Sequence, residues 1–174
     1  MHTENEIWMR VPPERVFELV AEISRWPVLL PHYRWVRVLE ERAGGRVAEM
    51  AARRGLFPVK WTSVQRLFPE NGRICYHHIS GITRGMDVEW RLTPRDGGTQ
   101  VVIVHDLALA GRLLRTELAG WIIGHLFVEA IAGRTLHHLK EFGEKEAAAT
   151  PQAEKKGNPN LRGQPDPGGS TGES

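Results

Sequence analysis

The feature that most constrains the fold is an uninterrupted series of short segments, between residues 33 and 109, in which apolar and polar side chains alternate. A period of two is typical of strands that bury one face. Turn-forming sequences such as PENG, SGITRG and RDGG separate most of these segments, and short turns join antiparallel neighbours. We therefore predict consecutive hairpins. The predicted strands cover residues 33–41, 46–55, 57–68, 73–80, 86–94 and 99–109.

The residues before this series predict one more strand and two short helices. Residues 4–11 suggest a strand, which two consecutive prolines end. Apolar residues then recur at helical spacing over residues 13–23. Ser24 is a suitable N-cap for a second short helix over residues 24–31, which its own prolines keep short.

A long helix is predicted to follow the strands, from about Leu113 to about Lys145, with a length of roughly 45 Å. Its middle, LAGWIIGHLFVEAIAG, is apolar around most of its circumference, but His125 and Glu129 interrupt it and it is too short for a membrane span. Contact with a membrane surface or with a second copy of the chain is an alternative to burial under a sheet. The predicted fold class is α+β, with a seven-stranded antiparallel sheet curved around the long helix and two short helices after strand one.

Length and composition favour one folded domain of residues 1–147, followed by a disordered tail of residues 148–174. The tail is rich in Pro, Gly and polar residues, so it cannot offset its ordering entropy by burial. The formal net charge is only +2, and the basic residues are scattered among acidic ones, which argues against nucleic-acid binding. A single cysteine and an N-terminus without a secretory signal pattern indicate a cytoplasmic protein.

The alternation also sorts side chains into faces. Trp61, Ser63 and Gln65 share one face of their strand, while Trp90 and His105 lie among inward apolar residues of two others. A concave sheet closed by a helix leaves room for a ligand, and pockets combine apolar walls with a few polar groups. Ordinary core packing is the alternative role for each tryptophan, as a hydrogen-bonded core position is for the histidine. The candidate pocket residues are Trp26, Tyr33, Trp61, Ser63, Gln65, Trp90 and His105.

Other chemical motifs are weak. His77 and His78 are neighbours on a strand and point to opposite faces, and His137 and His138 are about 100° apart on a helix. Neither pair can clamp a metal ion, so no metal site is predicted. The chain has no phosphate-binding glycine loop and no G-x-S-x-G nucleophile motif.

Four stretches of the chain carry a family resemblance, namely the opening HTENEIWMRVPPERVFELVAEISRWPVLLPHYRWVRVLE, MDVEWRLTP, GGTQVVIVHDLAL and HHLKEF. Together they resemble the START-like (SRPBCC) superfamily, and within it the polyketide cyclase/dehydrase group, and the likeness extends over residues 2–147. The resemblance implies a helix-grip fold whose cavity, in the aromatase/cyclases, holds a poly-β-ketone chain and guides aldol cyclisation and dehydration. It also implies that no metal or organic cofactor is needed.

The resemblance assigns roles to individual residues. Trp26, Tyr33, Trp61 and Ser63 match cavity positions of the aromatase/cyclases, with Tyr33 suited to proton donation and the tryptophans to shaping the cavity. Independently of the resemblance, His105 is expected to be a secondary proton-transfer group, because it is an inward titratable side chain. Where that group typically has an arginine, this chain has Gln65. A neutral amide cannot supply the charge of a guanidinium. The polar asparagine that the group carries on its long helix matches Glu129 or Ile131, and Glu129 is a further candidate for ligand binding.

The long helix, GRLLRTELAGWIIGHLFVEAIAGRTLHHLKEF, is also similar to that of the coenzyme Q-binding START family. This likeness implies a lipid-binding protein connected with quinone function. The expected partner is therefore a hydrophobic small molecule, namely a polyketide, a quinone or a lipid. A cyclase-like protein is the first interpretation and a non-catalytic carrier the second, and both a monomer and a homodimer are compatible with the sequence.

Overall fold

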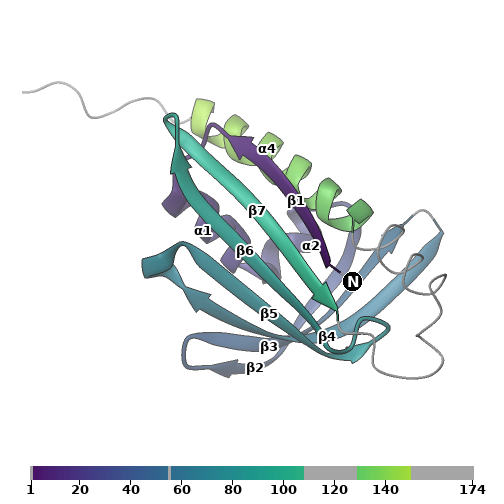
Figure 1. Ribbon diagram of the computed structural model, residues 1–174. Coiled ribbons are helices and arrows are strands. Elements are labelled where there is room, and N and C mark those ends of the chain that lie inside the picture. The colour runs from purple at the N-terminus through teal and green to yellow at the C-terminus, as the bar shows by residue number, and fades with distance from the viewer. Residues whose placement is uncertain (1, 55, 108–128, 150–174) are drawn as a thin grey trace, which may run out of the picture.

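The computed structural model describes residues 2–54, 56–107 and 129–149. Within them, seven strands form one antiparallel sheet in the order β1-β7-β6-β5-β4-β3-β2 (Figure 1). The sheet confirms the predicted hairpins, because each strand after β2 pairs with the strand that precedes it in the chain. The strands are β1 (His2–Met9), β2 (Tyr33–Arg42), β3 (Gly45–Arg54), β4 (Phe57–Phe68), β5 (Arg73–Gly81), β6 (Met86–Arg95) and β7 (Gly98–Leu107).

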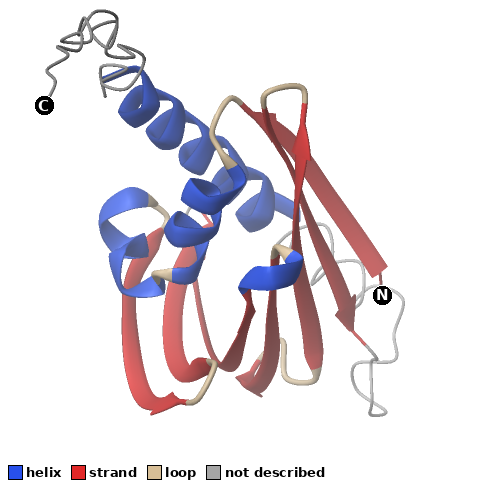
Figure 2. Cartoon of the chain, turned by 90° about the vertical axis from the view of Figure 1, so that its left-hand side faces the viewer, coloured by secondary structure: helices blue, strands red, loops and turns tan. Residues whose placement is uncertain are grey.

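Two short helices connect β1 to β2, as predicted. The first, α1 (Pro13–Ala21), begins at a proline, whose missing N–H is no loss at a helix start. A 3₁₀ turn, η1 (Ile23–Arg25), then leads directly into α2 (Trp26–Leu29), so the second helix starts later than the predicted cap at residue 24. Figure 2 shows the sheet curving around the helices.

The last described helix is α4 (Glu129–Ala149), which lies beside β1 and contacts α1 and α2 (Figure 1). Several polar contacts hold it there. Lys140 Nζ donates to the backbone oxygen of Trp8 at 2.9 Å, and the backbone N–H of Arg10 donates to Glu144 at 2.8 Å. The Arg15 guanidinium binds the Glu146 carboxylate at 2.8 Å. The first part of the predicted helix, residues 113–128, lies outside the described residues.

The faces of the strands agree with the predicted alternation. Trp61, Trp90 and His105 are buried, and their outward neighbours on β4 and β6 are polar. Register shifts between Tyr33 and Trp35 on β2, and between Val38 and Glu40, interrupt the ladder. Such irregularities increase the local bend of a strand, which favours a sheet that curves around the helices.

The tight turn between β6 and β7 shows why this hairpin forms. Asp96 and Gly97 both have positive φ, of 50° and 73°. A two-residue turn with positive φ at both central residues matches the twist of the flanking strands, and Asp-Gly is a favoured sequence for it. The hairpin aligns β6 with β7 over their whole length, from Met86 opposite Leu107 to Arg95 opposite Gly98.

The described residues suggest a test of the domain boundary. Helix α4 continues to Ala149, two residues beyond the expected domain end at residue 147. We predict that truncation after Ala149 changes Tm by no more than about 2 °C, because residues 150–174 have few apolar side chains that could be buried. Differential scanning calorimetry of the two chains measures the shift, and a loss of about 10 °C would show that residues 150–174 contribute to folding.

No helix among the described residues is long and apolar enough to cross a membrane.

Candidate functional site: an aromatic cavity under the sheet

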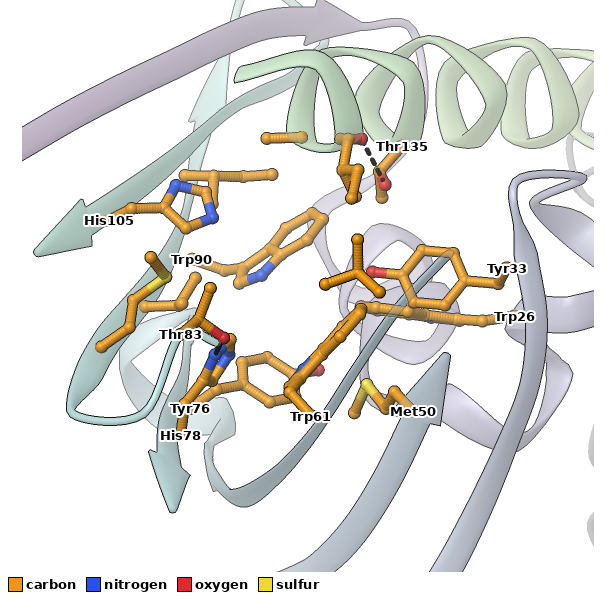
Figure 3. A pocket seen from close by; sticks show the side chains of 16 residues that line it. Trp26, Tyr33, Met50, Trp61, Tyr76, His78, Thr83, Trp90, His105 and Thr135 are labelled. Atoms are coloured by element: carbon orange, nitrogen blue, oxygen red, sulfur yellow. Dashed lines mark hydrogen bonds between the residues drawn. The ribbon is translucent and has the colours of Figure 1, made fainter. Parts of the chain in front are cut away.

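A cavity lies between the concave face of the sheet and α4 (Figure 3). Its volume, as the space open to the centres of water-sized molecules, is about 80 Å³. Apolar side chains of β3, β4, β6, β7 and α4 line it together with a smaller number of polar groups. This combination is characteristic of sites for small hydrophobic molecules. Five residues of the sequence-based set line the cavity, namely Trp26, Tyr33, Trp61, Trp90 and His105.

Aromatic rings form the walls of the cavity. Trp26 contacts Tyr33 edge-on with ring centroids 5.1 Å apart, and it lies 6.0 Å from Trp90. Tyr33 in turn lies 6.0 Å from Trp61. Trp26 comes from α2, and its indole N–H donates to the backbone oxygen of Leu19, which fixes the ring against α1. Rings held in this way are rigid surfaces on which a planar ligand can pack.

The tyrosine in this wall is a buried, protonated phenol. Tyr33 is 7% exposed, and burial raises its pKa above the ordinary value, an effect that the Thr135 hydroxyl partly opposes. Figure 3 shows the phenol oxygen directed into the cavity. Thr135 donates to the backbone oxygen of Ile131 at 2.8 Å and lies 2.9 Å from His32 Nε2. The phenol therefore retains its proton at neutral pH and can donate it to a ligand.

The histidines at the opposite end are neutral. Burial lowers the pKa of His105 to about 4, against a smaller opposing effect of Asp106. His78 also lines the cavity, and burial, with a contribution from His105, lowers its pKa to about 3. Its ring stacks on Trp61 at 5.8 Å, and its Nδ1 is 2.7 Å from the Thr83 hydroxyl. A neutral imidazole carries one donor and one acceptor, so both rings can exchange hydrogen bonds with a ligand.

The remaining predicted residues lie elsewhere. Ser63 and Gln65 are fully buried but are not among the residues that line the cavity. The Gln65 amide N–H₂ donates to the backbone oxygen of Ala21 at 3.1 Å and to the Tyr76 hydroxyl at 2.9 Å. It thus links β4, β5 and α1 behind the cavity. Glu129 is the first residue of α4, and its side chain lies outside the described part of the chain.

A cation is present close to Gln65, on the adjacent strand. Arg46 pairs with Gln65 in the β3–β4 ladder, and its side chain is 16% exposed. Its guanidinium is 3.3 Å from Glu22 and 3.8 Å from Glu41, and it does not line the cavity. No formally charged side chain of the described residues lines the cavity. Nor do those residues include a group of three or more His, Cys, Asp or Glu side chains that could hold a metal ion.

Sequence reasoning missed several cavity residues. Tyr76 and His78 follow Ile74 with a period of two on β5, so the same alternation that identified Trp90 was the signal for them. Thr83 lies in the turn after β5, where no periodicity indicates which way a side chain points. That Thr135 lines the cavity depends on the position of α4 relative to the sheet, which the sequence pattern does not give.

The chain is similar in sequence to a known family and to a curated protein. The family described as "Polyketide cyclase / dehydrase and lipid transport" matches residues 9–132. The actinorhodin polyketide synthase bifunctional cyclase/dehydratase of Streptomyces coelicolor is 31% identical over 101 residues, which are 57% of this chain and 32% of that protein. The chain therefore spans about a third of the length of this curated relative.

Solved structures show the same fold. The Zhui aromatase/cyclase of Streptomyces sp. R1128 has a TM-score of 0.76 at 24% identity, covering 86% of this chain and 96% of that one. A START superfamily protein from Mycobacterium smegmatis has a TM-score of 0.60 at 14% identity, covering 84% and 97%. The predicted helix-grip fold is thus confirmed. Because the matching family covers most of the chain, including β2 to β7, the protein belongs to the polyketide cyclase/dehydrase and lipid transport family.

Proposed function

We propose that the protein binds a poly-β-ketone, or an aromatic molecule derived from one, and promotes its intramolecular aldol cyclisation and dehydration. The observation that carries this proposal is the cavity itself, in which aromatic walls enclose a protonated phenol and a neutral imidazole. Membership of a family that includes polyketide cyclases supports the same chemistry. The curated relative is named as a cyclase/dehydratase, and the proposal extends that activity to this chain.

The two titratable groups suit opposite roles. A methylene between two ketones would lose its proton to the neutral His105, and the resulting enolate carbon would attack a ketone carbon further along the chain. The new alkoxide oxygen would take the proton of Tyr33, and the phenolate would regain a proton from water while the His105 imidazolium gives its proton to water. Loss of that hydroxyl as water, with a second proton from the adjacent carbon, would leave the ring double bond. The low pKa of His105 makes it a weak base, so positioning by the tryptophan walls has to contribute much of the rate.

A cyclisation assay tests this proposal. The wild-type protein is expected to change the product distribution of a poly-β-ketone relative to spontaneous cyclisation. Tyr33→Phe is expected to lower the rate about 100-fold while ligand affinity changes little, because it removes a proton donor but keeps the ring. His105→Ala should also lower the rate. A wild-type product distribution identical to the spontaneous one would refute the enzymatic proposal.

One observation favours a second function, that of a non-catalytic lipid or quinone carrier. Gln65 stands where the resemblance places the arginine of the aromatase/cyclases, and its amide is already bound to Ala21 and Tyr76. The described cavity lining therefore holds no fixed cation that could anchor a ketone chain. The similarity of the long helix to the coenzyme Q-binding START family stays a hypothesis. Saturable quenching of tryptophan fluorescence by a quinone, without any change in cyclisation products, would support this carrier.

A further inference from the structure

A second imidazole lines the cavity at the same end as His105, and the proposed chemistry does not use it. His78 is 8% exposed, and it is held by two contacts, the stack on Trp61 and the hydrogen bond to Thr83. These contacts determine the plane of the ring. The other ring nitrogen, Nε2, makes no hydrogen bond to the residues that the structure describes.

The two histidines flank one strand of the sheet. Val88 on β6 pairs with His105 on one side and with Tyr76 on the other, and His78 is the next inward residue after Tyr76. Figure 3 shows His78, Thr83 and His105 at one end of the cavity, with Tyr33 at the other. His105 also lines the cavity, and its Nδ1 atom is buried with no hydrogen-bond partner among the described residues. Because a neutral imidazole carries one donor and one acceptor, a ligand with a polar atom at this end of the cavity can exchange a hydrogen bond with the ring.

We propose that His78, Thr83 and His105 form a hydrogen-bonding subsite for an uncharged oxygen of an aromatic ligand, a hydroxyl or a carbonyl, and that this subsite disfavours carboxylates. This inference rests on the proposed function, because it assumes an aromatic ligand in the cavity.

The subsite can serve either kind of oxygen. The Thr83 hydroxyl can donate to Nδ1 of His78 or accept from it. In the first case Nε2 of His78 carries the proton and donates to a carbonyl, and in the second it is free to accept from a hydroxyl. A carboxylate would find no opposite charge among the described residues that line the cavity, and burial of an unpaired charge is strongly unfavourable.

Three two-ring probes of similar size test the subsite by isothermal titration calorimetry at pH 7. They are naphthalene, 2-naphthol and 2-naphthoate. The wild-type protein is expected to bind 2-naphthol about three- to tenfold more tightly than naphthalene, the gain of one hydrogen bond. It should bind 2-naphthoate about 100-fold more weakly than 2-naphthol. The ratio of the naphthol and naphthalene affinities is the readout, because a general change in cavity shape affects both probes.

Two variants then locate the effect. His78→Phe keeps a ring against Trp61, and Thr83→Val keeps the shape of the turn residue, so each should lower the ratio about threefold without weakening naphthalene. The matched control is His77→Phe, since His77 is exposed on the opposite face of the same strand and pairs with Asp87. An unchanged ratio in both variants, or 2-naphthoate bound as tightly as 2-naphthol, would overturn the subsite while leaving the cavity proposal intact. No binding of any probe by the wild-type protein would instead refute the proposed function, and the subsite with it.

Discussion

Replacement of Gln65 by arginine is expected to lower the free energy of unfolding by about 3 to 5 kcal/mol, the usual cost of an uncompensated buried charge. Gln65 is 1% exposed, and its amide bonds to Ala21 and Tyr76 would be lost. The new guanidinium would also lie beside Arg46, which is opposite this position in the β3–β4 ladder. Arg46 already forms an ion pair with Glu22. Urea unfolding of both proteins measures the difference.

Two further variants separate charge from lost hydrogen bonds. Gln65→Met has a similar volume and no charge, so its cost should be about 1 to 3 kcal/mol, from the unsatisfied groups of Ala21 and Tyr76. Arg66→Gln changes the exposed neighbour on the other face and should stay within about 0.5 kcal/mol of the wild type. If Gln65→Arg proved as stable as the wild type and increased cyclisation, the protein would be a dormant cyclase and the buried-charge argument would be wrong.

Acidification is expected to destabilise the fold by several kcal/mol between pH 6.5 and pH 4. Burial lowers the pKa of His32 to about 4, with help from the nearby His138 and Arg134, and it lowers the pKa values of His78 and His105 to about 3 and 4. In the unfolded chain each imidazole would titrate near its ordinary value of about 6.5. The unfolded state therefore binds more protons throughout this interval.

The sign and size of the effect follow from this difference. Stability contributed by the neutral histidines is fully present above pH 6.5 and is lost as the pH falls toward the folded-state values, by up to about 1.4 kcal/mol per pH unit for each ring. Urea unfolding at pH 7, 6 and 5 measures the slope, before most carboxylates titrate. Substitution of His78 or His105 by phenylalanine should reduce that slope. Stability that did not change between pH 7 and pH 5 would show that the three rings are not buried in solution.

The order of the elements was predictable from the sequence because it depends on local periods. Alternation identified the strands and placed Trp61, Trp90 and His105 inward, since a strand sends successive side chains to opposite faces wherever it lies. Turn-forming pairs such as Asp96-Gly97 indicated that consecutive strands are joined by short turns. Strands joined in this way are antiparallel neighbours, so the antiparallel sheet was predictable. The pairing of β1 with β7 joins strands far apart in the chain, and the local pattern did not predict it.

The candidate site was only partly predictable, because lining a cavity is a property of several elements together. Ser63 and Gln65 share a face with Trp61, yet they lie outside the cavity lining, and Gln65 is bound to α1 and β5. The sequence could not show this, since period two distinguishes inside from outside but not the cavity from the packed core. Alternation could have marked His78 as an inward residue, whereas Thr83 lies in a turn, where no periodicity applies.

The sequence by itself determined the order of helices and strands, the inward face of each strand and the family, all of which follow from short-range periodicity and motif order. The tertiary structure decided which inward side chains meet. It brought Thr135 of α4 near Tyr33, paired Arg46 with Gln65, and set two histidines on either side of β6. These contacts depend on the curvature of the sheet and the position of α4, and both result from packing between residues far apart in the chain.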